Sequence, residues 1–266
     1  MKVKKRKEKN RSKKRTVLRK IGQGILYSLL IFVGLSLFTV VLYRWVNPPI
    51  TPLMILRKIE NGAPIKQQWK DMEDISPYLT NCAVAAEDNN FLGHRGFDFG
   101  AIQKALDDRE HGRYRGASTI SQQTAKNIFL WDGRTWVRKG LEVYFTFLIE
   151  TFWSKERIME VYLNKIEMGN GIYGAEAAAQ HYFHKNAKSL TAYQAALIVA
   201  VFPAPLTRNP AQPTNYLSGR ANKILSLSKK IGAIKFDDKS IEQARERYQK
   251  REEKRRKKID GKLLDL

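Results

Sequence analysis

The sequence predicts a mainly α-helical domain behind one N-terminal transmembrane helix. An apolar run at 21–43 carries no charged residue and is long enough to cross a bilayer. Beyond residue 76, apolar side chains recur at three- and four-residue spacing, which is typical of amphipathic helices. Segments with the alternating pattern of β-strands are scarce, so we expect helices to form the core.

The charge of the chain is strongly positive and uneven. Its 266 residues carry a formal net charge of +22, and the length suits one medium domain with extensions. Lysine and arginine crowd residues 1–20, where Glu8 is the one acidic residue, and a second basic run lies at 250–258. Such ends bind either nucleic acid or an anionic membrane surface. The uncharged run at 21–43 favours the membrane.

The apolar run reads as an uncleaved anchor. At a rise of 1.5 Å per residue it spans about 34 Å, and it ends in Tyr43-Arg44-Trp45 where a signal peptide would carry a small-residue cleavage site. The positive-inside rule then puts the N-terminus in the cytoplasm and the rest outside the cytoplasmic (inner) membrane, in the periplasm. Cys82 is the single cysteine, so we expect no internal disulfide and a buried thiol.

Five segments follow from these patterns. We expect a basic tail at 1–20, the membrane helix at 21–43, a linker at 44–75, a catalytic domain at 76–238 and a basic C-terminal tail at 239–266 that is a charged helix or a frayed end. Within the linker, Leu53–Glu60 reads as a short helix before a turn at 61–64. Ser76-Pro77 and capping boxes that begin at Thr119 and Thr191 mark helix starts.

The first candidate site is the acidic pair Glu87-Asp88. The helix that starts at Ser76 should end there, and the helix dipole at a C-terminus raises the proton affinity of a carboxylate, as suits a general base. The alternative is a solvated acidic turn. His94 reads as a hydrogen-bonding residue, because no second His or Cys stands at metal-ligand spacing.

Two cationic segments follow. A loop with Arg113 and Arg115 leads into the helix capped by Thr119, an arrangement that can cradle a phosphate. On that helix one face would hold a hydroxyl, an amide and an ammonium, although an ordinary polar face is the alternative. The members of this face are Thr119, Gln122 or Gln123, and Lys126.

The second cationic segment has Arg134, Arg138 and Glu142 at four-residue spacing, with Lys139 beside them. Cations in the first turn of a helix oppose its dipole, so a bound anion explains them better than helix stability does. One carboxylate base, a cationic cluster for a diphosphate leaving group and a membrane tether together indicate transfer of a lipid-linked sugar.

Four ordered motifs resemble glycosyltransferase family 51, the peptidoglycan polymerases, and in particular its monofunctional members. The resemblance covers residues 76–210. The first motif, Glu-Asp-x-x-Phe-x-x-His-x-Gly, matches Glu87, Asp88, Phe91, His94 and Gly96. The second matches Gly116, Ser118, Thr119, Ile120, Gln122, Gln123, Lys126 and Asn127. The third matches Arg138, Lys139 and Glu142, and the fourth matches Lys155, Ile158, Glu160, Tyr162, Leu163 and Asn164.

The resemblance implies a lysozyme-like helical fold and a set of roles. Glu87 would take the proton from the GlcNAc 4-hydroxyl of lipid II, which displaces undecaprenyl pyrophosphate from the growing chain with inversion. Glu142 would orient donor-site groups or bind Mg²⁺ or Mn²⁺ that bridges the phosphates, with no organic cofactor. The pyrophosphate would be held by Lys126, Arg134, Arg138 and Lys139. Further substrate contacts would come from Asp88, Phe91, His94, Gly116, Ser118, Thr119, Gln122, Gln123, Asn127 and Asn164.

Partners and rivals follow from the same resemblance. We expect lipid II, the growing glycan chain, membrane lipid and cell-wall synthesis or division proteins as partners, and no nucleic acid. A transpeptidase is not expected, because Ser226-Leu227-Ser228-Lys229 has no Lys-Thr-Gly after it. The rival enzyme is a peptidoglycan-cleaving lysozyme-like hydrolase or lytic transglycosylase. The non-enzymatic rival is a scaffold that binds membrane or nucleic acid through its basic ends.

Overall fold

The computed structural model describes residues 2–113, 116–133 and 135–264, with the side chains of residues 2–17, 61 and 258–264 outside the description. The chain divides into two compact units, residues 1–46 and residues 47–266. Arg134, which the sequence placed in the cationic cluster, lies outside the described residues.

The first unit is the helix α1 (Lys2–Leu42). Its segment Leu18–Leu42 has a mean hydropathy of 2.6 and is long enough to cross a membrane. The basic segment 2–20, expected to be a solvated tail, has helical backbone continuous with this span. The prediction of a single N-terminal membrane anchor is confirmed, and it begins a few residues earlier than the uncharged run.

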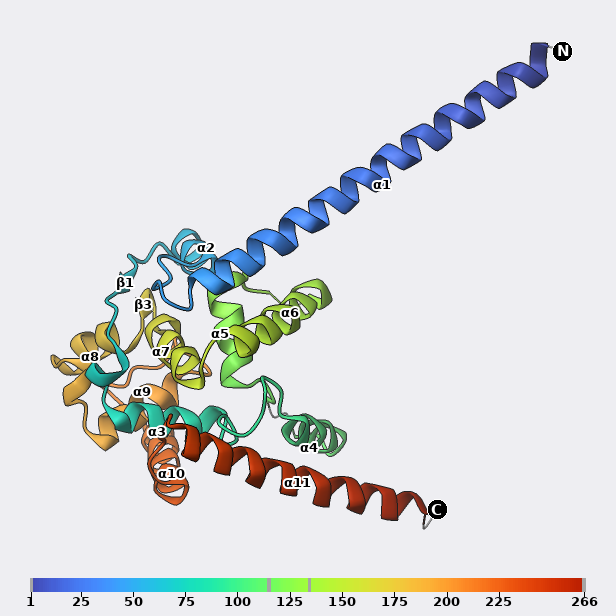
Figure 1. The fold of residues 1–266 in the computed structure, drawn as a ribbon. Coiled ribbons are helices and arrows are strands. Elements are labelled where there is room, and N and C mark those ends of the chain that lie inside the picture. The colour runs from blue at the N-terminus through green and yellow to red at the C-terminus, as the bar shows by residue number, and fades with distance from the viewer. Residues whose placement is uncertain (1, 114–115, 134, 265–266) are drawn as a thin grey trace. The chain divides into compact units, whose positions relative to one another are not determined.

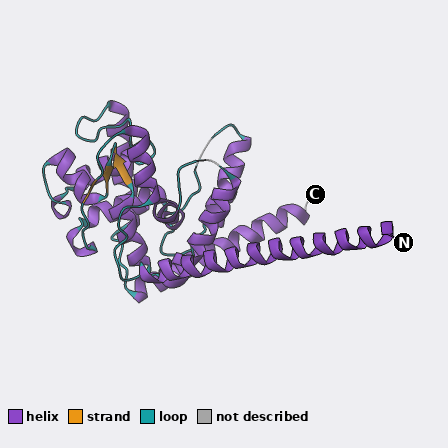
Figure 2. Cartoon of the chain, turned by 90° about the horizontal axis from the view of Figure 1, so that it is seen from above, coloured by secondary structure: helices purple, strands orange, loops and turns teal. Residues whose placement is uncertain are grey.

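The second unit is mainly helical, as the sequence predicts, with a small sheet (Figure 2). Its helices are α2 (Pro52–Asn61), α3 (Pro77–Glu87), α4 (Phe99–Glu110), α5 (Ile120–Phe129), α6 (Trp136–Phe152), α7 (Lys155–Lys165), α8 (Ala175–Phe183), α9 (Ala192–Val201), α10 (Asn215–Ile231) and α11 (Asp238–Leu264). Short 3₁₀ turns lie at Met72–Asp74 and Ala187–Ser189. The sheet has the order β1 (Lys66–Gln67), β3 (Ile172–Tyr173), β2 (Glu167–Gly169), with β1 parallel and β2 antiparallel to β3.

The core has two groups of packed helices, and the site lies where they meet. Helix α9 is apolar and buried from Ala195 to Val201, and it packs against α3 and α10 (Figure 1). Helix α5 packs against α6, α7 and α2. Because α3 ends beside α5, its C-terminal residue faces both groups. Cys82 is buried in α3, as expected.

The helix starts show how local signals fix these elements. Thr119 and Thr191 each form the predicted capping box, with Gln122 and Gln194 respectively. Ser76 behaves differently from expectation: it precedes Pro77 at the start of α3, but its hydroxyl donates to the carbonyl of Leu190 at 3.0 Å and makes no capping bond. Ser76 therefore ties α3 to the segment that leads into α9.

Candidate active site

Glu87 is the last residue of α3, and its carboxylate contacts side chains from α5 and α10. Gln123 Nε2 donates to Glu87 Oε2 at 3.0 Å, and Arg220 Nη2 lies 3.9 Å from Glu87 Oε1. Burial raises the pKa of Glu87, while the Gln123 hydrogen bond and the Arg220 charge lower it less. The predicted rise in proton affinity therefore agrees in direction, with burial as its largest cause. The side chain stays 17 % exposed, so a substrate hydroxyl can reach it.

Asp88 has hydrogen-bond partners other than those of Glu87 and holds the loop that follows α3. Its carboxylate accepts from His94 Nε2 at 2.9 Å and from the backbone N–H of Ile120, the first residue of α5, at 3.0 Å. His94 Nδ1 accepts from the N–H of Gly96 at 3.1 Å, so the ring proton lies on Nε2 and points at Asp88. Asp88 thus joins the end of α3 to the N-terminus of α5, where a carboxylate is favoured.

Phe91 and Gly96 complete this loop. Phe91 is fully buried, and the Lys155 ammonium lies 4.7 Å from its ring centroid while also pairing with Glu150 at 2.7 Å. Gly96 has a φ of +87°, a conformation that favours glycine, and its carbonyl accepts from the Thr119 hydroxyl at 2.7 Å. The predicted substrate contacts of Asp88, Phe91 and His94 stay predictions, since here these side chains are buried and engaged within the domain.

The residues of the second motif differ in how accessible they are at the start of helix α5. Thr119 and Gln122 are buried in the capping box, whereas Gln123 reaches Glu87. Gly116 and Ser118 are exposed just before the helix, and with Glu87 and Asn89 they line a cavity of about 80 Å³. Gln123 is therefore the one of the two glutamines that contacts Glu87, and the substrate contacts of both stay predictions.

Lys126 lies on α5 within the electrostatic reach of the cationic cluster. It lies three residues after Gln123 on α5, a rise of about 4.5 Å along one helix face. Burial lowers the pKa of Lys126, and the charges of Asp132 and Glu142 raise it. Within the described residues its ammonium donates no hydrogen bond, so it is free to meet an anionic group.

The cluster itself is formed by Arg138, Lys139 and Glu142 at the start of α6. Arg138 Nη1 donates to Glu142 Oε2 at 2.7 Å, and its Nε donates to the carbonyl of Gly133 at 2.6 Å. Lys139 pairs with Glu142 Oε1. Arg138 and Glu142 are buried and Lys139 is 40 % exposed. The structure brings these three predicted residues together, and Lys139 is the member that solvent or a ligand reaches.

The residues of the cluster do not suit a metal ion bound by Glu142. Both of its carboxylate oxygens already accept from cationic side chains. Among the described residues, no group of three or more His, Cys, Asp or Glu side chains converges as a metal site would require. The divalent cation stays a prediction, and we derive no chemical step through it.

Asn164 and Asn127 are buried side chains. The Asn164 side chain accepts from Lys70 N–H and donates to the carbonyls of Lys70 and Glu160, each at 2.8 Å. It therefore fastens the linker to α7. Asn127 is buried in α5. For both residues the substrate-binding role stays a prediction.

Sequence reasoning missed several residues around Glu87 and Lys126. Tyr162 is buried and donates to Gln123 Oε1 at 3.1 Å, and Arg220 faces Glu87 from α10. Arg57 of α2 pairs with Asp132 at 2.6 Å and lies 3.5 Å from Glu167, next to the charges around Lys126. Tyr162 stands in the fourth motif, which is a signal, whereas nothing in the local pattern marks Arg220 or Arg57.

The fold and the site together are those of a mainly helical protein with one membrane-length helix, a largely buried carboxylate at Glu87 and a cationic cluster at the start of α6. Comparison with known proteins agrees. The family model described as Transglycosylase matches residues 54–229. A biosynthetic peptidoglycan transglycosylase of Caulobacter vibrioides is 51 % identical over 83 % of this chain and 95 % of its own length. Proteins of the same description from Bdellovibrio bacteriovorus and Bacteroides thetaiotaomicron are also 51 % identical, over 77 % and 75 % of this chain and 85 % and 83 % of their own lengths. The chain belongs to the Transglycosylase family, and it is a glycosyltransferase.

Proposed function

We propose that the chain polymerises lipid II into linear peptidoglycan strands at the outer face of the cytoplasmic membrane. The growing lipid-linked chain is the donor, and the GlcNAc 4-hydroxyl of lipid II is the acceptor. The observation that carries the proposal is the position of Glu87, whose pKa burial raises. Its carboxylate accepts a hydrogen bond from Gln123, and Lys126 lies about one helical turn after Gln123 on α5. A base and a cation on one wall suit a reaction that deprotonates an alcohol and releases a diphosphate.

The base step follows from the surroundings of Glu87. Its Oε2 accepts from Gln123, which leaves Oε1 to take the acceptor's hydroxyl proton. The deprotonated oxygen attacks C1 of the donor sugar from the face opposite the diphosphate. The new C1–O4 bond forms as the bond from C1 to the phosphate oxygen breaks, so the configuration inverts and undecaprenyl pyrophosphate departs with the bonding electrons.

The departing diphosphate requires positive charge rather than a proton. Lys126 offers an ammonium without a hydrogen-bonding partner in the described part of the chain, and Lys139 offers a half-exposed one. Buried donors aimed at developing charge stabilise a transition state strongly, because little water screens them. Glu142 neutralises Arg138 and so keeps the cluster from repelling itself when no substrate is bound.

Membrane attachment supports a lipid-linked substrate. α1 carries the membrane-length segment, and α6 exposes a stripe of large apolar side chains at helical spacing, namely Trp136, Val143 and Phe147. Exposed tryptophan and phenylalanine on an otherwise charged protein favour the lipid interface. By the positive-inside rule, the basic residues before the span support a cytoplasmic N-terminus.

The test is turnover of labelled lipid II by the full chain in detergent. The proposal predicts growth of lysozyme-sensitive glycan with release of undecaprenyl pyrophosphate. A rival hydrolase or lytic enzyme would shorten preformed glycan and extend nothing. Shortening without growth would overturn the proposal, and the cationic cluster argues against that outcome, since cleavage of a glycan releases no diphosphate.

A further inference from the structure

Helix α11 lies beyond the residues that match the family model, yet it packs on the loop that follows Glu87. Tyr248 meets His94 edge to face, with ring centroids 6.1 Å apart, and its hydroxyl lies 3.4 Å from Asp98 Oδ1. At Gly93 a Cβ atom would lie 2.7 Å from Tyr248 Cβ and 2.9 Å from the carbonyl of Ala244, so only glycine permits this approach. α11 therefore packs closely against the loop that contains Gly93 and His94.

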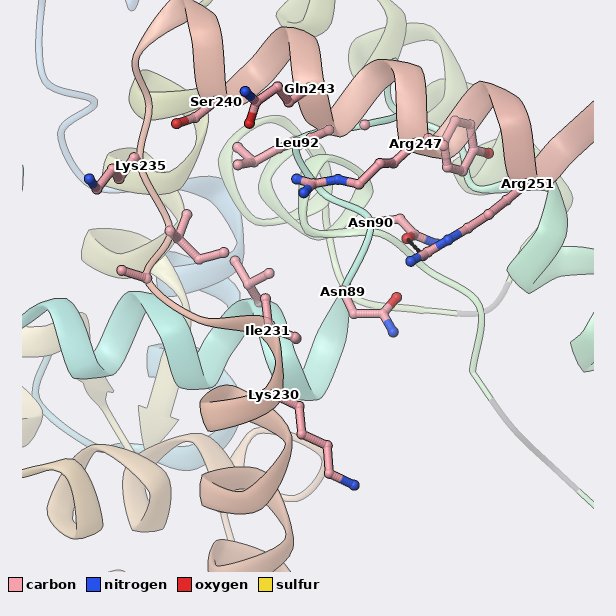
Figure 3. A pocket seen from close by; sticks show the side chains of 16 residues that line it. Asn89, Asn90, Leu92, Lys230, Ile231, Lys235, Ser240, Gln243, Arg247 and Arg251 are labelled. Atoms are coloured by element: carbon pink, nitrogen blue, oxygen red, sulfur yellow. Dashed lines mark hydrogen bonds between the residues drawn. The ribbon is translucent and has the colours of Figure 1, made fainter.

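This contact encloses a cavity of about 490 Å³ between α11, the α10–α11 connection and the loop at 89–93. That volume suits a ligand of several residues rather than a single ion. In Figure 3 the Arg247 side chain extends from α11 into the space beside Leu92, and Arg251 reaches Asn90. The cavity thus has one wall from α11 and one from the catalytic loop.

The charge of the lining is entirely positive. Lys230, Lys235, Arg247 and Arg251 line the cavity, and none of its described lining residues is acidic. Arg251 donates to Asn90 Oδ1 at 3.2 Å, whereas Arg247 makes no hydrogen bond or ion pair within the described residues. Like charges that line one cavity without a counter-charge repel one another, and a bound anion relieves that repulsion.

The rest of the lining favours a peptide as the carrier of that anion. Asn89, Asn90, Ser240 and Gln243 add uncharged donors and acceptors, which match amide groups as well as carboxylates. Asn89 also lines the 80 Å³ cavity that contains Glu87. A substrate held at Glu87 can therefore send a branch past Asn89 into the cationic cavity.

We propose that this cavity binds the carboxylate-bearing peptide branch of the glycan substrate, so that α11 contributes a substrate subsite. The inference rests on the proposed function for the identity of the substrate. The diphosphate end of such a substrate belongs at Lys126 and Lys139. Carboxylates of the peptide are then the anionic groups that remain for α11.

The experiment measures binding rather than turnover, on the full chain in detergent at low ionic strength. The probes are a soluble disaccharide-peptide with free carboxylates and the same compound with its carboxyl groups amidated. Wild type should bind the free-carboxylate probe about five-fold more tightly, the range expected for partly exposed charge pairs. Arg247→Gln should remove most of this preference, and Lys235→Gln should lower it.

Lys250→Gln is the matched control, because Lys250 is exposed on the same helix and does not line the cavity. It should keep the preference. Equal binding of both probes by wild type, or equal losses in Arg247→Gln and Lys250→Gln, would overturn the inference. If the chain polymerises lipid II but binds the free-carboxylate and amidated probes equally, the inference is wrong and the proposed function still stands. A carboxylate preference in a chain that extends no glycan would contradict the proposed function alone.

Discussion

Gln123 donates its side-chain amide to Glu87 at 3.0 Å and at the same time accepts from the Tyr162 hydroxyl at 3.1 Å. The ionised Glu87 carboxylate can only accept, so the NH₂ end of the Gln123 amide faces it and the amide oxygen faces the Tyr162 hydroxyl, which donates. Glu87 Oε2 is thereby held by a neutral donor. A neutral donor orients the carboxylate without suppressing its basicity as strongly as a cation at the same distance would.

Tyr162→Phe tests this chain of hydrogen bonds. The change leaves Gln123 Oε1 without its donor in a buried site, so the free energy of unfolding should fall by about 1–3 kcal/mol. The turnover number should fall as well, because the amide of Gln123 loses its fixed orientation. Thermal unfolding and lipid II turnover measure the two effects. Tyr193→Phe, at an exposed position of α9, should change neither. Unchanged stability and turnover in Tyr162→Phe would exclude the orienting role.

The pH dependence of turnover tests the basicity of Glu87. Only the ionised carboxylate can take a proton, and burial raises its pKa above the usual 4.5. The acid limb of the kcat/KM profile should therefore fall at a pH above 4.5. The free energy of unfolding depends on pH in the opposite sense, because the folded state binds the Glu87 proton more tightly than the unfolded chain does. The stabilisation from the protonated Glu87 is therefore fully present below the unfolded pKa and is lost as pH rises through the folded pKa. An acid limb at or below 4.5 would contradict the assignment.

Glu142→Gln tests the cationic cluster. The amide keeps the size of the side chain but leaves Arg138 buried without its counter-charge, so unfolding should become easier by about 3–5 kcal/mol. Glu246→Gln removes an exposed carboxylate of α11 and should cost far less. Denaturant unfolding measures the free energy of unfolding of the two variants. Equal decreases in Glu142→Gln and Glu246→Gln would show that the ion pair with Arg138 contributes little to stability.

Lys126→Gln separates activity from stability. Because burial penalises the ammonium, its replacement by an amide should leave thermal stability unchanged or slightly higher. Turnover should nevertheless fall on the order of 10²–10³-fold if the ammonium stabilises the departing diphosphate. Lys104→Gln, on the exposed face of α4, is the control for charge alone. Equal turnover in the Lys126 and Lys104 variants would remove Lys126 from the site.

Much of the local structure could be predicted from the sequence. The capping boxes at Thr119 and Thr191, the end of α3 at Glu87 and the membrane span depend on neighbouring residues, so their patterns are visible in the chain. The resemblance to family 51 located the carboxylate and the cations, although their roles toward substrate stay predictions.

The contacts between distant segments could not be predicted in the same way. Arg220 meets Glu87 only because α10 packs on α3, and Ser76 bonds the carbonyl of Leu190 far along the chain. The C-terminal segment offered two alternatives, and the structure shows the helix α11. Charged residues lie on all sides of α11, so the helix has no apolar stripe that would predict a packed face. The contact of Tyr248, the aromatic residue of this helix, with His94 could therefore not be predicted.

The most direct test of the account is the rate of glycan growth from labelled lipid II by Glu87→Gln, compared with wild type and with Glu110→Gln at an exposed position of α4. The amide can still accept from Gln123 but cannot take a proton, and it relieves the penalty of burying a charge. We predict that Glu87→Gln extends no glycan at a melting temperature no lower than that of wild type, while Glu110→Gln keeps full activity. Glycan growth by Glu87→Gln at the wild-type rate would contradict the account.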